Sequence, residues 1–194
     1  MLPSRVRAAA LAGVHLIQIR ERDLDGGQLS RLTRECLEAV RGTRTRVIVN
    51  DRLDVAITTG AHGVHLRGDS MPSPRARSLA PVGFLIGRSV HTVEEALYEG
   101  IGALDYFLFG TVFETTSKPG QQPAGVERLA AVSQATTRPV LAVGGITPQR
   151  ATAVARAGAA GVAAIGLFAN GSLDAMRTIV GELSSAFDTL GGVP

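Results

Sequence analysis

The sequence predicts a barrel of parallel strands surrounded by helices, and three observations lead to that fold. Short apolar runs of strand length alternate with amphipathic stretches along the 194 residues. The runs show no strict alternation of apolar and polar residues, which is typical of strands buried on both faces. A glycine precedes several of them, as in the αβ loops of repeated βα units. We therefore expect one domain over residues 1–194 with TIM (β/α)8-type architecture, and an open doubly wound sheet is the alternative.

Seven apolar runs qualify as strands. In chain order they are 16–19, 47–49, 63–66, 84–86, 106–109, 140–143 and 162–165. A helix-like segment at 5–11 comes before the first run, so the barrel is expected to lack its N-terminal first strand. The runs 16–20 and 162–165 would then have unpaired edges, which favour association of copies. We therefore expect a homo-oligomer.

Helices are expected where apolar periodicity follows a capping residue. Residues 28–41 place their apolar side chains on one stripe. Thr92 and Thr147 are N-cap residues for helices over 93–98 and 148–157, and the second of these opens on a proline. Ser172 and Asp174 open a last helix that runs to about residue 190.

The composition excludes several classes of protein. A hydrophobic fraction of 45% with 19% charged residues excludes a disordered chain. Aromatic residues at 4% and scattered arginines, with a net charge of +3, suit anionic small molecules better than nucleic acid. No apolar run has membrane-spanning length, and Cys36 as the single cysteine excludes an intrachain disulfide. We expect a cytoplasmic protein that binds neither nucleic acid nor a membrane.

Polar residues gather where the expected strands end, and the strand entries are mostly small residues. The polar positions are Gln18, Arg20, Asn50, Asp51, Arg67, Asp69, Ser89, His91, Thr111, Gly144, Gly145 and Gly166. Active sites of parallel α/β folds lie at the carboxyl ends of the strands. The sequence therefore predicts a site at this edge of the barrel.

Two late loops predict phosphate binding. Gly144 and Gly145 end one strand and open a helix, where bare backbone N–H groups bind phosphate. The next unit ends at Ile165 and Gly166, and two such adjacent loops form the usual barrel phosphate site. The alternative for the double glycine is a tight turn.

The loop 110–120 predicts a second anion contact. Its residues 115–117 carry three consecutive hydroxyl groups, and they are followed by Lys118, the only lysine of the chain. Hydroxyls and an ammonium group together suit a diphosphate, and a solvated loop is the alternative. Asp51 beside these groups suggests a Mg²⁺ ligand, or else an Asx turn that opens a helix at Arg52. His65 lies inside a strand and is expected to be a satisfied core histidine.

Seven segments resemble the thiamine phosphate synthase / TenI family in order and spacing across essentially the whole chain. They read QIRER (18–22), VND (49–51), GVHL (63–66), IGRSVHT (86–92), DYFLFG (105–110), FETTSK (113–118) and VGGI (143–146). The resemblance implies a synthase that joins hydroxymethylpyrimidine diphosphate to thiazole phosphate and releases pyrophosphate with Mg²⁺. Stabilising the charge of the leaving group is then the main catalytic task.

The resemblance also implies roles for individual residues. It places Gln18 on the pyrimidine, Arg20, Asn50, Ser89 and Lys118 on the diphosphate, Thr115 and Ser117 on the thiazole phosphate, and backbone groups of Gly145, Ile165 and Gly166 nearby. Of these, Arg20, Ser89 and Lys118 are expected to be catalytic. Asp51 and Asp69 are the expected metal ligands.

The sequence departs from the family pattern at three positions. Arg22 stands where the family typically has lysine and is expected to bind substrate in its place, and Gly166 stands where many synthases have serine. The second metal-binding aspartate of the synthases aligns with Ser70, so Asp69 falls one place early. These departures keep two alternatives open. One is a TenI-like thiazole tautomerase, although Thr111 stands where that chemistry uses a histidine, and the other is a non-catalytic binder or regulator of thiamine precursors.

Overall fold

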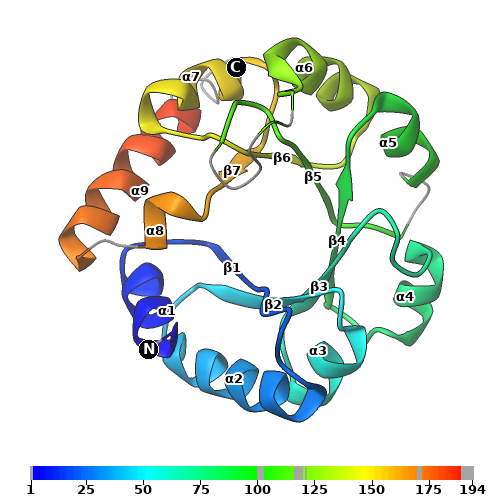
Figure 1. The fold of residues 1–194 in the computed structure, drawn as a ribbon, viewed down its shortest axis with the longest axis vertical. Helices are drawn as coiled ribbons and strands as arrows, with labels where there is room; N and C mark the ends of the chain where they lie inside the picture. The colour runs from blue at the N-terminus through cyan, green and yellow to red at the C-terminus, as the bar shows by residue number, and fades with distance from the viewer. Residues whose placement is uncertain (1, 100–102, 116–119, 121, 170–171, 189–194) are drawn as a thin grey trace.

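The computed structural model describes residues 2–99, 103–115, 120, 122–169 and 172–188. Within them, seven parallel strands form one sheet in which spatial order follows chain order. The strands are β1 (Leu16–Ile19), β2 (Arg46–Asn50), β3 (Gly63–Leu66), β4 (Leu85–Val90), β5 (Tyr106–Gly110), β6 (Val140–Val143) and β7 (Gly161–Ala163). Figure 1 shows the sheet curled into a barrel with the helices as an outer ring. The predicted TIM-like barrel is confirmed.

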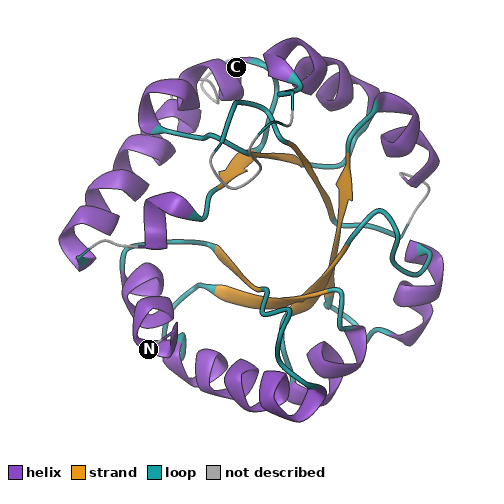
Figure 2. Ribbon diagram, viewed as in Figure 1, coloured by secondary structure: helices purple, strands orange, loops and turns teal. Residues whose placement is uncertain are grey.

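Helices follow the strands around the outside of the barrel (Figure 2). They are α1 (Leu2–Leu11), α2 (Gly26–Ala39), α3 (Leu53–Thr59), α4 (Ser73–Leu79), α5 (Val93–Glu99), α6 (Gly125–Ala135), α7 (Pro148–Arg156), α8 (Gly166–Ala169) and α9 (Leu173–Asp188). The predicted end of the last helix, at residue 190, lies outside the described residues. In the part of the chain that the structure describes, no helix is long and apolar enough to cross a membrane.

The core lies between the sheet and the helices. Alternate strand residues such as Val47, Val49, Phe107 and Phe109 are fully buried and pack in one cluster with helix residues such as Leu129. Because side chains alternate across a strand, the intervening residues face the inside of the barrel. Among them the register places His65 beside Gly87, and Gly87 beside Tyr106.

Capping explains where several helices begin. The Asp25 carboxylate accepts a hydrogen bond from the backbone N–H of Gln28, and the Gln28 side-chain oxygen accepts one from the backbone N–H of Asp25. This capping box starts α2 two residues before the predicted position. Thr92 and Ser172 accept hydrogen bonds from the backbone N–H groups of Glu95 and Ala175, whereas Thr147 occupies its cap position without a side-chain bond.

The last predicted strand is wrong in its bounds. The run 162–165 was expected to be extended, but β7 ends at Ala163 and α8 begins at Gly166. Ile165 is 68% exposed, because it lies in the turn between these elements rather than in the sheet. A short helix, α8, therefore precedes the helix near Ser172. The apolar run 162–165 gave no indication of it.

The two ends of the sheet, β1 and β7, are not paired with each other among the described residues. The helical layer is nevertheless continuous there, because α1 packs against both α2 and α9. Val6 and Ala10 of α1 are buried in the main core cluster. The gap in the sheet is thus covered on its outer side by helix packing.

Candidate functional site

The ends of β1 and β2 bring Gln18 and Asn50 together. The Gln18 amide Nε2 donates a hydrogen bond of 3.0 Å to Oδ1 of Asn50. Both side chains are half-buried, and Asn50 pairs in register with His65 of β3. A paired amide of this kind presents a fixed pattern of donors and acceptors, which suits a flat heterocycle or a phosphate oxygen.

Asp51 follows β2 and is the only non-glycine residue with positive φ (62°) among those described. Its carboxylate accepts a hydrogen bond from the Ser70 hydroxyl, and Oδ2 lies 3.6 Å from Nε of Arg67. Helix α3 starts at Leu53 with Arg52 as its N-cap and has no side-chain capping bond. Asp51 is therefore not a capping residue, and its carboxylate faces the end of β3.

Arg67, directly after β3, contacts two carboxylates. Besides Asp51, it makes a bidentate pair with Asp69, with Nε–Oδ1 at 2.9 Å and Nη2–Oδ2 at 2.6 Å. This fork geometry lowers the pKa of Asp69. Asp69, an expected metal ligand, is thus engaged by Arg67, and Ser70 rather than Asp69 contacts Asp51.

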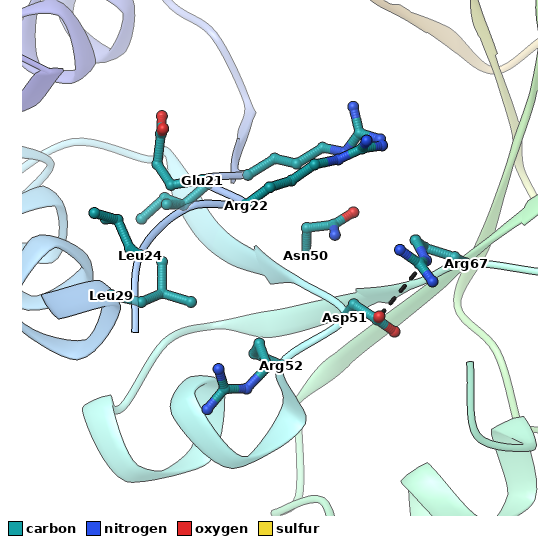
Figure 3. A pocket seen from close by; sticks show the side chains of 10 residues that line it. Glu21, Arg22, Leu24, Leu29, Asn50, Asp51, Arg52 and Arg67 are labelled. Carbon is teal, nitrogen blue, oxygen red and sulfur yellow. Dashed lines mark ion pairs between the residues drawn. The ribbon is translucent and has the colours of Figure 1, made fainter. Parts of the chain in front are cut away.

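These loops enclose a pocket of about 270 Å³ (Figure 3). Its charged lining residues are Arg20, Glu21, Arg22, Asp51, Arg52 and Arg67. Figure 3 shows Arg67 facing Asp51, with Arg52 turned away from it, and Arg52 pairs instead with Asp54 at 2.6 Å. Arg20 and Arg22 make no ion pair with any described residue, so the pocket has an excess of positive charge.

The excess of positive charge changes the pKa of Arg20. Partial burial and the neighbouring guanidinium groups of Arg22 and Arg67 lower the pKa of Arg20. Like charges held this close are costly without a counter-charge. The pocket is therefore built for an anion that carries more than one negative charge.

Ser89 of β4 contacts a histidine side chain inside the barrel. Its Oγ lies 2.9 Å from Nε2 of His65, whose Nδ1 lies 3.0 Å from the Tyr106 hydroxyl. His65 is only 2% exposed, and burial lowers its pKa to about 4, with Arg20 and Arg88 as further causes. The prediction of a satisfied core histidine is confirmed by these bonds.

The loops after β5 and β6 approach each other closely at the double glycine. Gly144 and Gly145 have φ of 101° and 61°, in a region that glycine adopts readily and other residues rarely. A Cβ on Gly145 would lie 2.4 Å from the Glu114 carbonyl oxygen, so the 113–115 loop passes directly over this turn. The Arg150 guanidinium lies 4.7 Å from the centroid of the Phe113 ring and donates to the Gly145 carbonyl at 2.7 Å. The double glycine is thus a tight turn that also brings two loops and an arginine together.

The structure describes some, but not all, of the remaining residues that were expected at the site. Thr115 is described and half-buried, whereas Ser117 and Lys118 lie outside the described residues. Ile165 and Gly166 lie at the start of α8, where a Cβ on Gly166 would meet open space. The roles assigned to these residues stay predictions.

Sequence reasoning gave no binding role to Arg67 or Arg150, and it did not find the Tyr106 contact to His65. Arg67 directly follows an apolar run, and that position was a usable signal. Arg150 and Tyr106 act through contacts across 37 and 41 positions of the chain, respectively, which no local pattern reports.

Comparisons with known proteins agree with this geometry. The family model described as thiamine monophosphate synthase matches residues 1–168. A thiamine-phosphate synthase of Methanocella arvoryzae is 42% identical over 164 residues, 84% of this chain and 77% of the relative. One from Coprothermobacter proteolyticus is 38% identical over 164 residues, 84% of this chain and 78% of the relative.

Solved structures extend the likeness to the fold. The thiamine phosphate pyrophosphorylase of Pyrococcus furiosus superposes with a TM-score of 0.84 at 29% identity, covering 98% of this chain and 91% of that one. A 3-hexulose-6-phosphate synthase, at 18% identity and a TM-score of 0.68 over 93% of this chain and 94% of that one, shares the fold alone. By sequence and by structure, this chain belongs to the thiamine monophosphate synthase family.

Proposed function

We propose that this chain is a thiamine-phosphate synthase, a transferase that joins hydroxymethylpyrimidine diphosphate to thiazole phosphate and releases pyrophosphate. One observation carries the proposal within this family. The pocket at the ends of β1–β3 combines Arg20 and Arg22, which make no ion pair with a described residue, with Asn50, whose Oδ1 accepts a hydrogen bond from Gln18. Those are groups for a diphosphate and for a polar heterocycle, held side by side.

In this reaction the C–O bond to the diphosphate breaks, and the electron pair leaves with pyrophosphate. The pyrimidine-stabilised cation that remains is captured by the thiazole nitrogen, which forms the new N–C bond. Arg20 and Arg22 lower the barrier by stabilising the charge that develops on the leaving oxygen. Gln18 orients the pyrimidine and Asn50 contacts the diphosphate, and their mutual hydrogen bond limits the rotation of both amides.

The thiazole phosphate is expected at the loops after β5 and β6. The 113–115 loop lies over Gly144 and Gly145, and Arg150 adds a positive charge at the same turn. Thr115 and backbone groups at Gly145, Ile165 and Gly166 complete this proposed subsite. Thr111, where a tautomerase would need an acid or base, is buried at 6% exposure, and a threonine hydroxyl is a poor general acid or base near neutral pH, which favours the synthase.

Magnesium fits the oxygen donors of this site. Mg²⁺ is usually bound through one or two carboxylates together with substrate phosphates and water. The Asp51 carboxylate and the Ser70 hydroxyl are adjacent oxygen donors, although no group of three acidic, histidine or cysteine side chains gathers among the described residues. We assign Asp51 as the main protein ligand, and Asp69 as a second one only after it leaves Arg67. Bound there, the ion would neutralise charge on the diphosphate.

Pyrophosphate release tests the proposal. We expect release that requires both precursors and Mg²⁺. No release, with thiazole phosphate still bound in calorimetry, would indicate a binder, and proton exchange in a thiazole carboxylate phosphate would indicate a tautomerase. Either result would overturn the proposal.

Lys118→Ala tests the contribution of the 110–120 loop. If the ammonium group contacts the diphosphate, the variant loses most of its turnover. Arg128→Ala, which removes an exposed cation from α6, is the matched control and should keep its turnover. Unchanged turnover in Lys118→Ala would remove this residue from the mechanism.

We also propose a homo-oligomer in the cytoplasm. Strands β1 and β7 each have an edge without a partner strand among the described residues, which supports association. The buried free thiol of Cys36 fits a reducing compartment. Sedimentation velocity decides the first point, because a stable monomer across the micromolar range would contradict it.

A further inference from the structure

Three side chains inside the barrel form a chain of hydrogen bonds that ends at Ser89, which is expected to contact the diphosphate. Tyr106 of β5, His65 of β3 and Ser89 of β4 are linked by contacts of 3.0 Å and 2.9 Å. Tyr106 is 7% exposed and His65 is 2% exposed, whereas Ser89 is only half-buried at the carboxyl end of its strand. The chain therefore runs from the dry interior to the open edge of the barrel.

The direction of these hydrogen bonds follows from the partners available. Among the described residues, the Tyr106 hydroxyl has no hydrogen-bond partner except Nδ1 of His65. If Nδ1 carried the proton, the tyrosine hydrogen would be buried without an acceptor, at a cost comparable to a lost hydrogen bond. With the tyrosine as donor, Nδ1 accepts, and no side-chain atom of the three is left buried and unsatisfied.

Protonation states support that direction. Burial raises the pKa of Tyr106, so its hydroxyl keeps the proton and donates it to Nδ1 of His65. A neutral imidazole has one N–H, and an accepting Nδ1 places it on Nε2. Nε2 then donates to Ser89 Oγ, and the Ser89 hydroxyl hydrogen must point elsewhere.

We propose that Tyr106 and His65 are positioning residues that fix the ring tautomer of His65 and so hold Ser89 as a hydrogen-bond donor toward the diphosphate. This inference rests on the proposed function for the identity of the acceptor. The inference about the tautomer does not depend on the proposed function, because the tautomer is a property of the free protein. Gly87 makes the arrangement possible, because a Cβ there would lie 2.4 Å from the Tyr106 hydroxyl oxygen.

The tautomer is measured directly by ¹⁵N NMR of the imidazole nitrogens in the wild-type protein at pH 7. We expect the His65 proton on Nε2, with Nδ1 showing the shift of an unprotonated nitrogen. Tyr106→Phe should abolish this preference. Tyr98→Phe alters the other tyrosine of the chain, which is exposed, and should leave the tautomer preference unchanged. A proton on Nδ1 in the wild type would overturn the proposal without any reference to activity.

Pyrophosphate binding by calorimetry tests the consequence for Ser89. A hydrogen bond to a charged acceptor predicts that Ser89→Ala weakens binding about tenfold. Tyr106→Phe should weaken it by a similar factor, and the double variant should be no weaker than Ser89→Ala alone. A general structural defect would instead add to the serine loss, and additive losses would overturn the proposal.

The two hypotheses fail in different ways. If the wild type does not bind pyrophosphate, the proposed function is contradicted while the NMR result still stands. If the wild type binds pyrophosphate and Ser89→Ala binds equally well, the role of Ser89 as donor is wrong. Because the wild-type spectrum needs no substitution, a variant that fails to fold does not remove the test.

Discussion

Arg67 lies between two carboxylates at the edge of the pocket, and its removal tests what those carboxylates do. In Arg67→Ala, Asp51 and Asp69 lose their guanidinium partner and repel an anion. We expect pyrophosphate affinity without metal to fall about tenfold, since a charge-assisted contact is lost, and to recover when Mg²⁺ neutralises Asp51. Calorimetry with and without Mg²⁺ measures both.

Arg52→Ala is the control for this substitution. Arg52 lines the same pocket but pairs with Asp54, away from Asp51. Its removal should change pyrophosphate affinity less than twofold in either condition. Equal losses in the two variants, with no effect of Mg²⁺, would show that Arg67 only adds to the general positive charge.

Gly87 is a position where the barrel interior has no room for a side chain. A Cβ there would lie 2.0 Å from the Tyr106 ring, so Gly87→Ala should lower the free energy of unfolding by about 3 kcal/mol. Gly181→Ala in α9, where a Cβ meets nothing within 4 Å, should raise it by about 0.5 kcal/mol. Urea unfolding of both variants decides, and equal stabilities would contradict the packing argument.

For individual residues, the positions of polar side chains at the site were predicted better than the contacts between them. Gln18, Asn50 and Asp51 were expected at one edge because each follows or ends an apolar run, and the structure places them there. The bond between Ser70 and Asp51 spans 19 positions and depends on the path of a loop. Such contacts are properties of tertiary structure, so no local pattern could predict them.

The N-terminus of α2 shows what one helix contributes. Asp25 caps this helix through a reciprocal pair of hydrogen bonds with Gln28, directly after the loop that carries Arg20 and Arg22. Asp25→Ala should lower the free energy of unfolding by about 1 kcal/mol. Asp23→Ala, two positions earlier and outside the cap, should change it by less than about 0.5 kcal/mol. Equal effects in urea unfolding would mean that only surface charge matters here.

Elements were predictable where burial is strong and the segment is long. Strands such as β3 and β6 have the predicted bounds, because parallel strands that are covered on both faces form nearly continuous apolar runs. The seven-residue helix α4 was missed and α3 was only an alternative opening at Arg52, since two turns give too few residues to define a periodicity. Helix α5 has the same length but was marked by its Thr92 cap. The end of β7 was misplaced because an exposed Ile165 in a turn continues the apolar run.

The stability of the whole molecule should depend on the proton affinity of His65. The pKa of this residue is about 4 in the fold and 6.5 in its usual range, so the unfolded chain binds the proton first as the pH falls. Stability is therefore full above pH 6.5 and declines between pH 6.5 and about 4. We expect a loss of about 2 kcal/mol between pH 7 and pH 5.

Urea unfolding at several pH values checks this slope. His91→Gln should retain the slope, because His91 lies near the surface and its ring contacts the Gly110 carbonyl. His65→Gln should flatten it, whatever its effect on the absolute stability. A wild-type stability that is constant from pH 7 to pH 5 would contradict the expected burial of a neutral ring.

The unpaired outer edge of β1 has a dynamic consequence, since Gln18 lies in that strand and Arg20 directly follows it. Amide hydrogens of β1 should exchange with solvent faster than those of β3–β5, whose strands are paired on both sides. A ligand that bridges the ends of β1–β3 then ties the first strand to the rest of the barrel. At a hundred times its Kd, pyrophosphate would stabilise the closed form by about 2.7 kcal/mol and slow this local exchange accordingly. Because local unfolding and ligand binding are thermodynamically linked, the rate of amide hydrogen exchange in β1 should therefore report whether substrate is bound.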